Sequence, residues 1–362
     1  MKLRKIALIV FALMIVIASC TPDDDGTTTV PARDRTEVYA EDLLEIETFL
    51  ETHYLNLEDN PFDFVNLYNP DNDDFKIVFS ELEAGSTEVA LIDMPQLKFK
   101  TVEDPSEEGL FYKLYYLEMR QGLGNEVHFI DEVFVTYEGS TTESIVFDDA
   151  INPINFELTS VLNGGVVTGF MESLIEFKTA TSFDTNNDGT SNYHNHGIGA
   201  AFLPSGLAYF NQVLEDVSSY TPLIFKFNVL DRVLLDHDND GIPSFLEDLD
   251  NNSDVFDDDT NDDTAPNFFD GDDDGDGTNT IDEITIKSYT VDDNMIAFAS
   301  TEEANDYFEN GAEIDENEVF ISVEYTKNTA TTPTVYTLKT FVATDSNGNG
   351  TADYLDETYP ED

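Results

Sequence analysis

The amino-acid sequence predicts an α+β fold that is built on an antiparallel sheet and followed by an acidic segment. Three observations lead to this prediction. Apolar residues recur with period two in many short runs between residues 38 and 233, whereas helical periodicity is confined to two stretches. A hydrophobic fraction of 40%, with 27 Phe and 16 Tyr, is high enough to form a core. From Asp236 to Glu283 nineteen residues are acidic and none is Lys or Arg, so this segment cannot fold alone.

The first predicted element is an amphipathic helix at residues 38–54, whose apolar residues recur at helical spacing. They are Leu43, Ile46, Phe49, Leu50 and Tyr54. A second, short helix is centred on Phe170. Strands are predicted at 75–82, 89–94, 97–102, 111–119, 132–137, 144–147, 156–159, 200–203 and 223–233, and a C-terminal group at 284–291, 319–325 and 335–342. Many strands with little helix are typical of an antiparallel α+β domain, which we expect to end near Val233.

Residues 1–19 have the pattern of an export signal. Three basic residues precede an apolar run that is too short to span a bilayer, and small residues then lead to Cys20, the only cysteine. This resembles a bacterial lipoprotein signal, in which Cys20 would be acylated and anchor the chain to a membrane. An ordinary signal peptide or membrane anchor with an incidental cysteine is the alternative. Residues 20–37 form a polar tether, and their acidic triplet resembles the export tag of surface lipoproteins of Bacteroidetes.

The charge of the chain excludes one class of partner. With 76 acidic and 16 basic residues the formal net charge is -60. Nucleic acids are bound by clustered Lys and Arg, so no nucleic-acid partner is expected.

The order of the acidic residues after Val233 predicts calcium as a structural ion. Oxygen ligands at positions 1, 3, 5 and 12, with glycine at position 6, are typical of a calcium loop of about 12 residues. The candidate ligands are Asp236, Asp238, Asp240 and Glu247 in one copy, Asp272, Asp274, Asp276 and Glu283 in a second, and Asp345, Asn347, Asn349 and Asp356 in a third. Asparagine replaces two carboxylates in the third copy, which predicts a lower affinity. A solvated acidic spacer or an adaptation to salt is the alternative.

Two further copies of this pattern are incomplete. The copy that begins at Asp259 and ends at Asp270 has Thr264 where glycine is needed. The copy at Asp184–Asn195 lies inside the folded domain, where a polar turn between strands explains it equally well. Pro243 and Pro266 argue against the flanking helices of an EF-hand, and the spacing of the copies resembles thrombospondin type 3 repeats.

The folded domain carries a second resemblance. Five fragments fall in the order and approximate spacing of the FKBP-type peptidyl-prolyl isomerases, and they are residues 135–139, 146–148, 166–170, 202–209 and 223–230. The resemblance implies an FKBP-like antiparallel sheet wrapped on a short helix over 127–233, with 38–126 as an N-terminal extension. It also implies peptidyl-prolyl isomerase activity on proline-containing exported polypeptides, with no cofactor in catalysis.

The same resemblance implies a set of pocket residues around the substrate proline. They are Tyr137, Phe147, Asp148, Val166, Val167, Phe170, Tyr209 and Phe225. Phe170 would form the floor, the main-chain N–H of Val167 would hold the substrate carbonyl, Asp148 would orient polar groups, and Tyr209 would cap the site, with Val217 at the rim. For the aromatic residues, packing in an ordinary core is the alternative.

The sequence departs from the family pattern at three places. Ile154 replaces an expected aromatic wall residue, Phe210 stands where the family usually has glycine, and residues 179–199 replace a tight strand connection with a polar loop. A non-catalytic, calcium-binding surface lipoprotein that binds proline-containing chains is therefore a second hypothesis. His194 and His196 belong to the polar loop, where solvated histidines are expected rather than zinc ligands.

These observations divide the chain into six segments. They are a lipoprotein signal at 1–19, a tether at 20–37, the N-terminal extension at 38–126, the isomerase-like domain at 127–233, the calcium loops at 234–283 and a β-rich module at 284–362. We expect an outer-membrane lipoprotein facing the periplasm or the cell surface, and its oligomeric state stays open.

Overall fold

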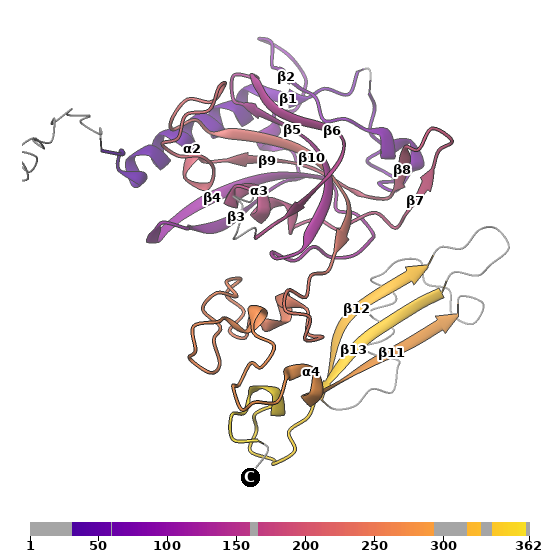
Figure 1. Ribbon diagram of the computed structural model, residues 1–362. Coiled ribbons are helices and arrows are strands. Elements are labelled where there is room, and N and C mark those ends of the chain that lie inside the picture. Colours follow the sequence, from indigo (N-terminus) through magenta and orange to yellow (C-terminus); the bar gives the residue numbers. More distant parts are fainter. Residues whose placement is uncertain (1–30, 59, 160–165, 293–316, 327–334, 360–362) are drawn as a thin grey trace, which may run out of the picture. The chain divides into compact units, whose positions relative to one another are not determined.

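The structure, a computed structural model, describes residues 31–58, 60–159, 166–292, 317–326 and 335–359 (Figure 1). The expected signal peptide and Cys20 lie outside these residues. The elements described below lie within Asp34–Asp362, which forms one compact unit. Among the described residues, none of the helices is both long and apolar enough to cross a bilayer.

A six-stranded sheet organises the larger part of this unit. Its strands are β3 (Leu97–Asp104), β4 (Glu107–Arg120), β5 (Glu132–Thr141), β6 (Val146–Glu157), β9 (Gly197–Leu203) and β10 (Leu223–Val233). Their order is β3-β4-β9-β10-β5-β6, and every neighbouring pair is antiparallel (Figure 1). The predicted α+β class with an antiparallel sheet is confirmed.

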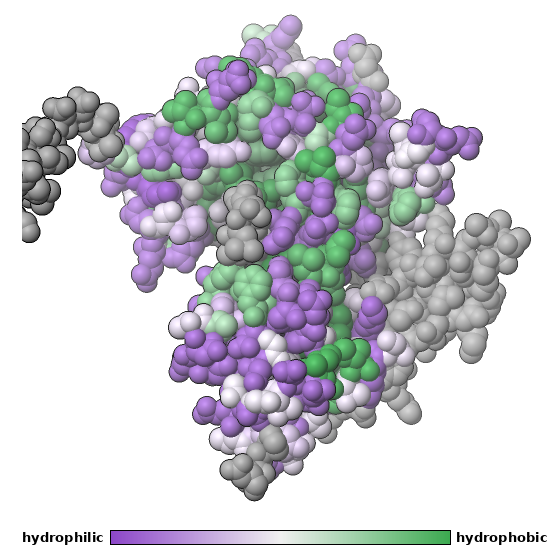
Figure 2. All heavy atoms as spheres, in the orientation of Figure 1, coloured by the Kyte–Doolittle hydropathy of each residue, from purple (hydrophilic) through white to green (hydrophobic). Residues whose placement is uncertain are grey.

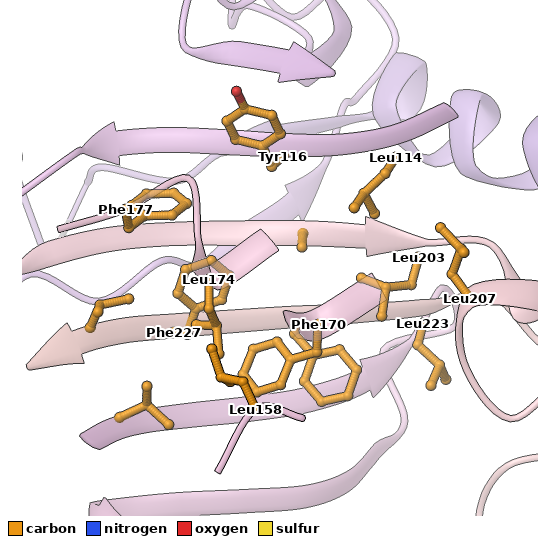
Figure 3. Close-up of a cluster of buried hydrophobic side chains, with 14 of the residues drawn as sticks. Leu114, Tyr116, Leu158, Phe170, Leu174, Phe177, Leu203, Leu207, Leu223 and Phe227 are labelled. Carbon is orange, nitrogen blue, oxygen red and sulfur yellow. The ribbon is translucent and has the colours of Figure 1, made fainter. Parts of the chain in front are cut away.

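Both faces of the sheet are covered, by α3 (Thr168–Leu174) on one side and by α2 (Arg35–Thr52) on the other. Successive residues of a strand point to opposite faces. In the central strand β9, Ala201 and Leu203 pack with the buried side chains around α3, which we call the α3 cluster. Ala200 and Phe202 point to the other face and pack with the buried side chains around α2, the α2 cluster. All seven residues of β9 are therefore buried. Figure 3 shows side chains of α3 among those of the strands.

Helix α2 corresponds to the predicted helix at 38–54. It begins after Asp34, whose side chain accepts a hydrogen bond from the N–H of Glu37 at 3.0 Å and so caps the helix. Its buried side includes Ile46, Phe49 and Leu50, which pack on the sheet. The N-terminal extension is thus part of the same core, and its strands β3 and β4 share one sheet with β5, β6, β9 and β10.

The sequence predicted some local conformations wrongly. The run at 89–94 contains a 3-10 turn, Leu91–Asp93, and in the run at 75–82 only β2 (Phe79–Glu81) is a strand, paired with β1 (His53–Leu55). Apolar periodicity indicated buried residues in both runs, since Phe75 and Leu91 are buried although Val89 is exposed, but burial does not specify the backbone. The strands predicted at 144–147 and 156–159 belong to β6, an edge strand whose largely exposed side chains hide the alternation.

The predicted polar loop at 179–199 contains a hairpin of β7 (Ser182–Thr185) and β8 (Ser191–His194). The C-terminal strands β11 (Ile284–Asp292), β12 (Glu318–Thr326) and β13 (Val335–Ala343) form a separate sheet of order β11-β13-β12. In the sequence between β10 and β11, the acidic segment contains only single helical turns, one of which is α4 (Thr280–Glu283). Hydrophilic side chains cover much of the face shown in Figure 2, as expected for a net charge of -60.

Candidate functional site

An aromatic pocket lies between β5, β6, β10 and α3. Its volume is about 250 Å³, and it is lined by Tyr137, Asp148, Asn155, Phe156, Glu157, Val166, Val167, Phe170, Tyr209 and Phe225. Small-molecule pockets usually enclose roughly 300–1,000 Å³, so this one suits a single ring-sized group. Seven of the eight predicted pocket residues line it, although the sequence scatters them over 89 positions from Tyr137 to Phe225.

Stacked rings form the floor of the pocket. Phe170 of α3 lies against Phe225 of β10 with ring centroids 4.6 Å apart and planes 21° apart. Tyr137 of β5 lies 5.8 Å from Phe170 and 6.1 Å from Phe225. Phe170 is only 2% exposed, so the part of its ring that lines the pocket is small. The ring packing makes the floor apolar and rigid.

Phe147 is the predicted pocket residue that does not line the cavity. Its ring packs edge-on against Phe225 at 5.8 Å and Tyr209 at 6.4 Å, so it supports two residues that do. The close approach depends on Gly139, because a Cβ there would lie 2.8 Å from the Phe147 ring. Val217, predicted at the rim, is buried in the sheet core instead.

The polar groups of the pocket lie at its edge. The Tyr137 hydroxyl donates to Asp148 Oδ2 at 2.6 Å. Burial, and then the Asp148 carboxylate that accepts this bond, raises the pKa of Tyr137 above its usual value. Burial also raises the pKa of Tyr209, with a further contribution from Asp148. Both phenols therefore stay protonated at neutral pH and can donate hydrogen bonds.

Val167 lies at the start of α3 and is its N-cap residue. The first N–H groups of a helix have no partner inside the helix, so they are available to a carbonyl oxygen.

The residue after Tyr209 is Phe210, where glycine was expected, and its ring makes a contact that glycine could not make. Phe210 has a φ of +47°, a left-handed conformation that glycine adopts without strain, and its ring lies under the Arg35 guanidinium, 4.0 Å from the ring centroid.

Sequence reasoning missed three residues of the pocket, Asn155, Phe156 and Glu157. The expected wall aromatic is present, but at Phe156 rather than at Ile154. Residues two apart on a strand share a face, and the Phe156 ring lies 5.7 Å from Tyr137 and 6.4 Å from Phe170. The sequence allowed this alternative, because moving the wall aromatic two residues along β6 leaves its side chain on the same face of the strand.

The acidic segment forms loops with one repeated backbone geometry. In each loop the carboxylate at position 1 accepts a hydrogen bond from the N–H at position 6, and the residues at positions 4 and 6 have positive φ. The loops begin at Asp236, Asp248, Asp259, Asp272 and Asp345. The loop at Asp248 was not predicted, because Ser253 takes the left-handed conformation that usually requires glycine.

Four of these loops share a second feature. The N–H at position 2 donates to the side chain at position 9, which is Ser244, Asn267, Thr280 or Asp353. A single helical turn then ends at the position-12 carboxylate or at the residue before it. The predicted absence of long flanking helices agrees with these single turns.

Three groups of carboxylates are close enough to hold a metal ion. One contains Asp238, Asp240, Glu247 and Asp273, a second contains Asp272, Asp274 and Asp276, and a third contains Asp248, Asp250 and Asp258. Within each group the candidate ligand atoms lie within 4.8 Å of one another. Of the predicted ligands in the first two copies, six fall into these groups, while Asp236 and Glu283 do not.

Those two residues still face the loops. Asp236 Oδ1 and Glu283 Oε1 are buried and have no hydrogen-bond partner in the described part of the chain. Burial first, and then the neighbouring Asp274 and Asp276, raises the pKa of Glu283 to about 8. Oxygen-rich sites of this kind suit Ca²⁺, which takes six to eight oxygen ligands. The donor set therefore fits the predicted structural ion.

The loops at Asp259 and Asp345 are arranged differently. The side-chain amides of Asn347 and Asn349 both donate to Asp356 Oδ2, at 2.8 and 2.7 Å. The Asn261 amide likewise donates to Asp270 at 3.2 Å. In these loops an amide donates to the position-12 carboxylate, and the lower affinity expected for the third predicted copy stays a prediction.

The pattern at Asp184–Asn195 forms the hairpin turn rather than a calcium loop. Asp184 Oδ2 lies 2.9 Å from His194 Nε2, whose other ring nitrogen lies 3.1 Å from Asp73. The pKa of His194 is raised, chiefly by its hydrogen bond to Asp184, which favours the protonated ring. His196 is buried near Arg120, and burial lowers its pKa to about 4. Neither histidine belongs to the metal-ligand groups found among the described residues.

Known proteins resemble separate parts of the chain. A family profile described as BamM C-terminal matches residues 237–319, less than half of the chain. This is not a thrombospondin profile, so the resemblance to thrombospondin type 3 repeats stays a prediction. No protein with a curated description matches.

The solved structures that are similar to the chain include the following three. A peptidyl-prolyl cis-trans isomerase from Pseudomonas syringae has 19% identity and a TM-score of 0.28, over 39% of this chain and 83% of that one. FkpA from Escherichia coli has 20% identity and a TM-score of 0.29, over 39% and 53%. The FKBP domains of wheat FKBP73 have 13% identity and a TM-score of 0.27, over 33% and 46%. The chain spans about half the length of the last two. All three TM-scores lie below 0.5, so these similarities say nothing about the function of this chain.

Proposed function

We propose that the chain is a peptidyl-prolyl cis-trans isomerase that acts on proline-containing exported polypeptides. The observation that supports this most strongly is the pocket, in which apolar rings form the floor and hydroxyl groups lie at the edge. Its size suits a proline ring, and its open side leaves the flanking peptide outside.

The pocket supplies what the reaction needs. Twisting an X–Pro bond destroys amide resonance, which gives a barrier of ~18–20 kcal/mol in water. The twisted amide has less charge separation than the planar one, so an apolar, water-excluding site favours it. Phe170 and Phe225 would contact the proline ring, the Val167 N–H would bind the substrate carbonyl, and Tyr209 would donate a hydrogen bond to the peptide. No nucleophile is required.

An exchange assay on an X–Pro peptide tests this activity, by NMR or by protease coupling. Tyr209→Phe removes the capping hydroxyl and should reduce kcat/KM roughly three- to tenfold, the effect of one hydrogen bond. Tyr193→Phe is the matched control, because Tyr193 lies in the β7–β8 hairpin and outside the pocket. A folded chain with no rate above background contradicts the proposal. If that chain still binds proline peptides, it is a binding module, the second hypothesis.

We further propose that Ca²⁺ braces the acidic segment and that Cys20 is acylated, so that the protein is an outer-membrane lipoprotein. The calcium role is supported by the carboxylate groups at Asp238 and Asp272. The anchor rests on the sequence pattern of residues 1–20. Cys20→Ser should leave the protein in the soluble fraction and remove the acyl mass from the intact protein. A variant that stays bound to membranes would count against the anchor.

A further inference from the structure

One carboxylate in the acidic segment belongs to a different loop from the group that it joins. Asp273 is the second residue of the loop at Asp272, yet its ligand atom groups with Asp238, Asp240 and Glu247 of the first loop. Its two neighbours, Asp272 and Asp274, belong to the group of their own loop. Position 2 is acidic in this loop alone of the five, the other residues there being His237, Leu249, Thr260 and Ser346.

The group that Asp273 joins is buried and short of partners. Asp273 is 1% exposed, and Asp240 and Glu247 are each 2% exposed. Both side-chain oxygens of Asp273 and of Glu247, and one each of Asp238 and Asp240, have no hydrogen-bond partner in the described part of the chain. Six carboxylate oxygens are thus buried without a donor. Burying a charge without a partner is costly, so something must offset these charges.

The surroundings of Asp273 confirm the side to which it points. Its ligand atom lies within 4.8 Å of the ligand atoms of Asp238, Asp240 and Glu247. The main-chain N–H of Asp273 is already used, because it donates to Thr280 Oγ1 at 3.2 Å. The side chain therefore faces the first loop while the backbone completes the geometry of its own loop.

We propose that Asp273 completes the cation site of the first loop, so that one divalent ion binds residues 236–247 and 272–283 together. This inference rests on the calcium role proposed above. A buried set of four carboxylates, without nitrogen or sulfur ligands, selects Ca²⁺ over zinc or copper. Mg²⁺ usually keeps several waters, which a site this buried does not favour.

The composite site also borders an apolar cluster. Ile242, which lies between Asp240 and Glu247 in the first loop, is fully buried with Ile284, Ile321, Phe341 and Tyr354. These residues come from β11, β12, β13 and the last loop. An ion that fixes the first loop would thereby fix the packing of Ile242 against the C-terminal sheet. The proposed role of Asp273 is to join two loops that are separated in sequence by 24 residues, from Asp248 to Gly271.

Calcium titration of the full chain by calorimetry tests this proposal, with four single variants and one double variant. Asp273→Asn keeps the size of the side chain and removes its charge. We expect it to weaken one ion by roughly tenfold or more, and this should be the same ion that Glu247→Gln weakens. The double variant should weaken that same ion further and leave the other ions unchanged, because both residues bind one ion. Asp276→Asn should weaken a different ion, and Asp282→Asn, an exposed neighbour, should weaken none.

Hydrogen exchange gives a second measurement that does not depend on calorimetric resolution. In calcium, Asp273→Asn should accelerate exchange in residues 236–247, although the substitution lies in another loop. Unchanged affinities together with unchanged exchange in 236–247 would overturn the composite site. So would a loss confined to the ion that Asp276→Asn weakens. If the unsubstituted chain binds no calcium, the calcium role itself fails, and that outcome is distinct from a failure of Asp273 alone.

Discussion

The sheet domain, from α2 to β10, and the acidic loops that follow it bury carboxylates in two different ways. In the sheet domain, Asp42 of α2 is 2% exposed, but its Oδ2 accepts hydrogen bonds from both the N–H and the Oγ of Ser205, each at 2.7 Å. In the loops, Glu247 is equally buried and neither oxygen has a partner among the described residues. A buried charge needs donors or a cation. The first region carries its own donors, whereas for the second we propose an ion from solution.

Removal of calcium should therefore affect the acidic loops and leave the sheet domain unchanged, and this is the largest effect that we expect. A chelator should expand residues 234–362 and abolish hydrogen-exchange protection in the loops, because the carboxylates then repel one another. Protection in β4, β9 and β10 should stay unchanged, because their core is apolar. X-ray scattering and exchange mass spectrometry measure both. Scattering curves that are identical with and without chelator would contradict the dependence on an ion.

Truncation of the pocket floor should have the converse effect. Phe225→Ala removes a ring that contacts Phe170, Tyr137 and Phe147, and should reduce the free energy of unfolding of the sheet domain by about 3–5 kcal/mol. Isomerase activity should fall with it. Phe183→Ala is the matched control, since Phe183 is 49% exposed in the β7–β8 hairpin. Calcium affinities that fell in the Phe225 variant would show that the two regions are not independent.

The carboxylate of Asp42 should give the sheet domain a distinctive pH dependence. Burial, only partly offset by Ser205, raises the pKa of Asp42 to about 6 in the folded chain, against 3.8 as its ordinary value. The folded state therefore binds the proton more tightly, and the contribution of this group to stability falls as pH rises from about 4 to 6. A shift of about two units corresponds to at most about 3 kcal/mol.

Asp42→Asn isolates this contribution. The difference in unfolding free energy between the unsubstituted chain and the variant should decrease across that pH range and then level off above pH 6. Denaturation in excess calcium, followed by near-ultraviolet circular dichroism, measures the difference. Subtraction also removes the opposite trend expected from His196, whose low pKa favours stability at higher pH. A difference that does not vary with pH would show that the Ser205 donors fully stabilise the charged form.

The smallest expected effect concerns the irregular loop at Asp259. Thr264 has a φ of +84°, which a β-branched residue adopts only under strain. Thr264→Gly should stabilise this loop by about 1 kcal/mol. The reverse substitution, Gly277→Thr in the loop at Asp272, should destabilise by a similar amount, because Gly277 has a φ of +97°. Hydrogen exchange of each loop in calcium measures both, and equal protection in all three chains would refute the strain.

The ligand order in the sequence predicted the calcium-type loops where glycine stands at position 6, and it missed the loop at Asp248 because Ser253 adopts the same φ without being glycine. It also missed Asp273, because the ligand pattern of a calcium loop includes no side chain at position 2. In the pocket, the residues of β5, α3 and β10 were predicted well. Phe156 was not, because the register of an exposed edge strand is fixed by pairing with β5 and not by the apolar pattern.

The junction between the loops and the C-terminal sheet has a mechanical consequence. Glu283, the position-12 carboxylate, ends α4, and Ile284 begins β11 at the next residue. Strand β13, which pairs with β11, ends at Ala343. Only Thr344 then precedes Asp345, the first residue of the last loop. Tension applied across this sheet would thus reach loop carboxylates within one or two residues, with no slack linker to absorb it. The sheet should resist pulling to the extent that the adjoining carboxylates hold their ions.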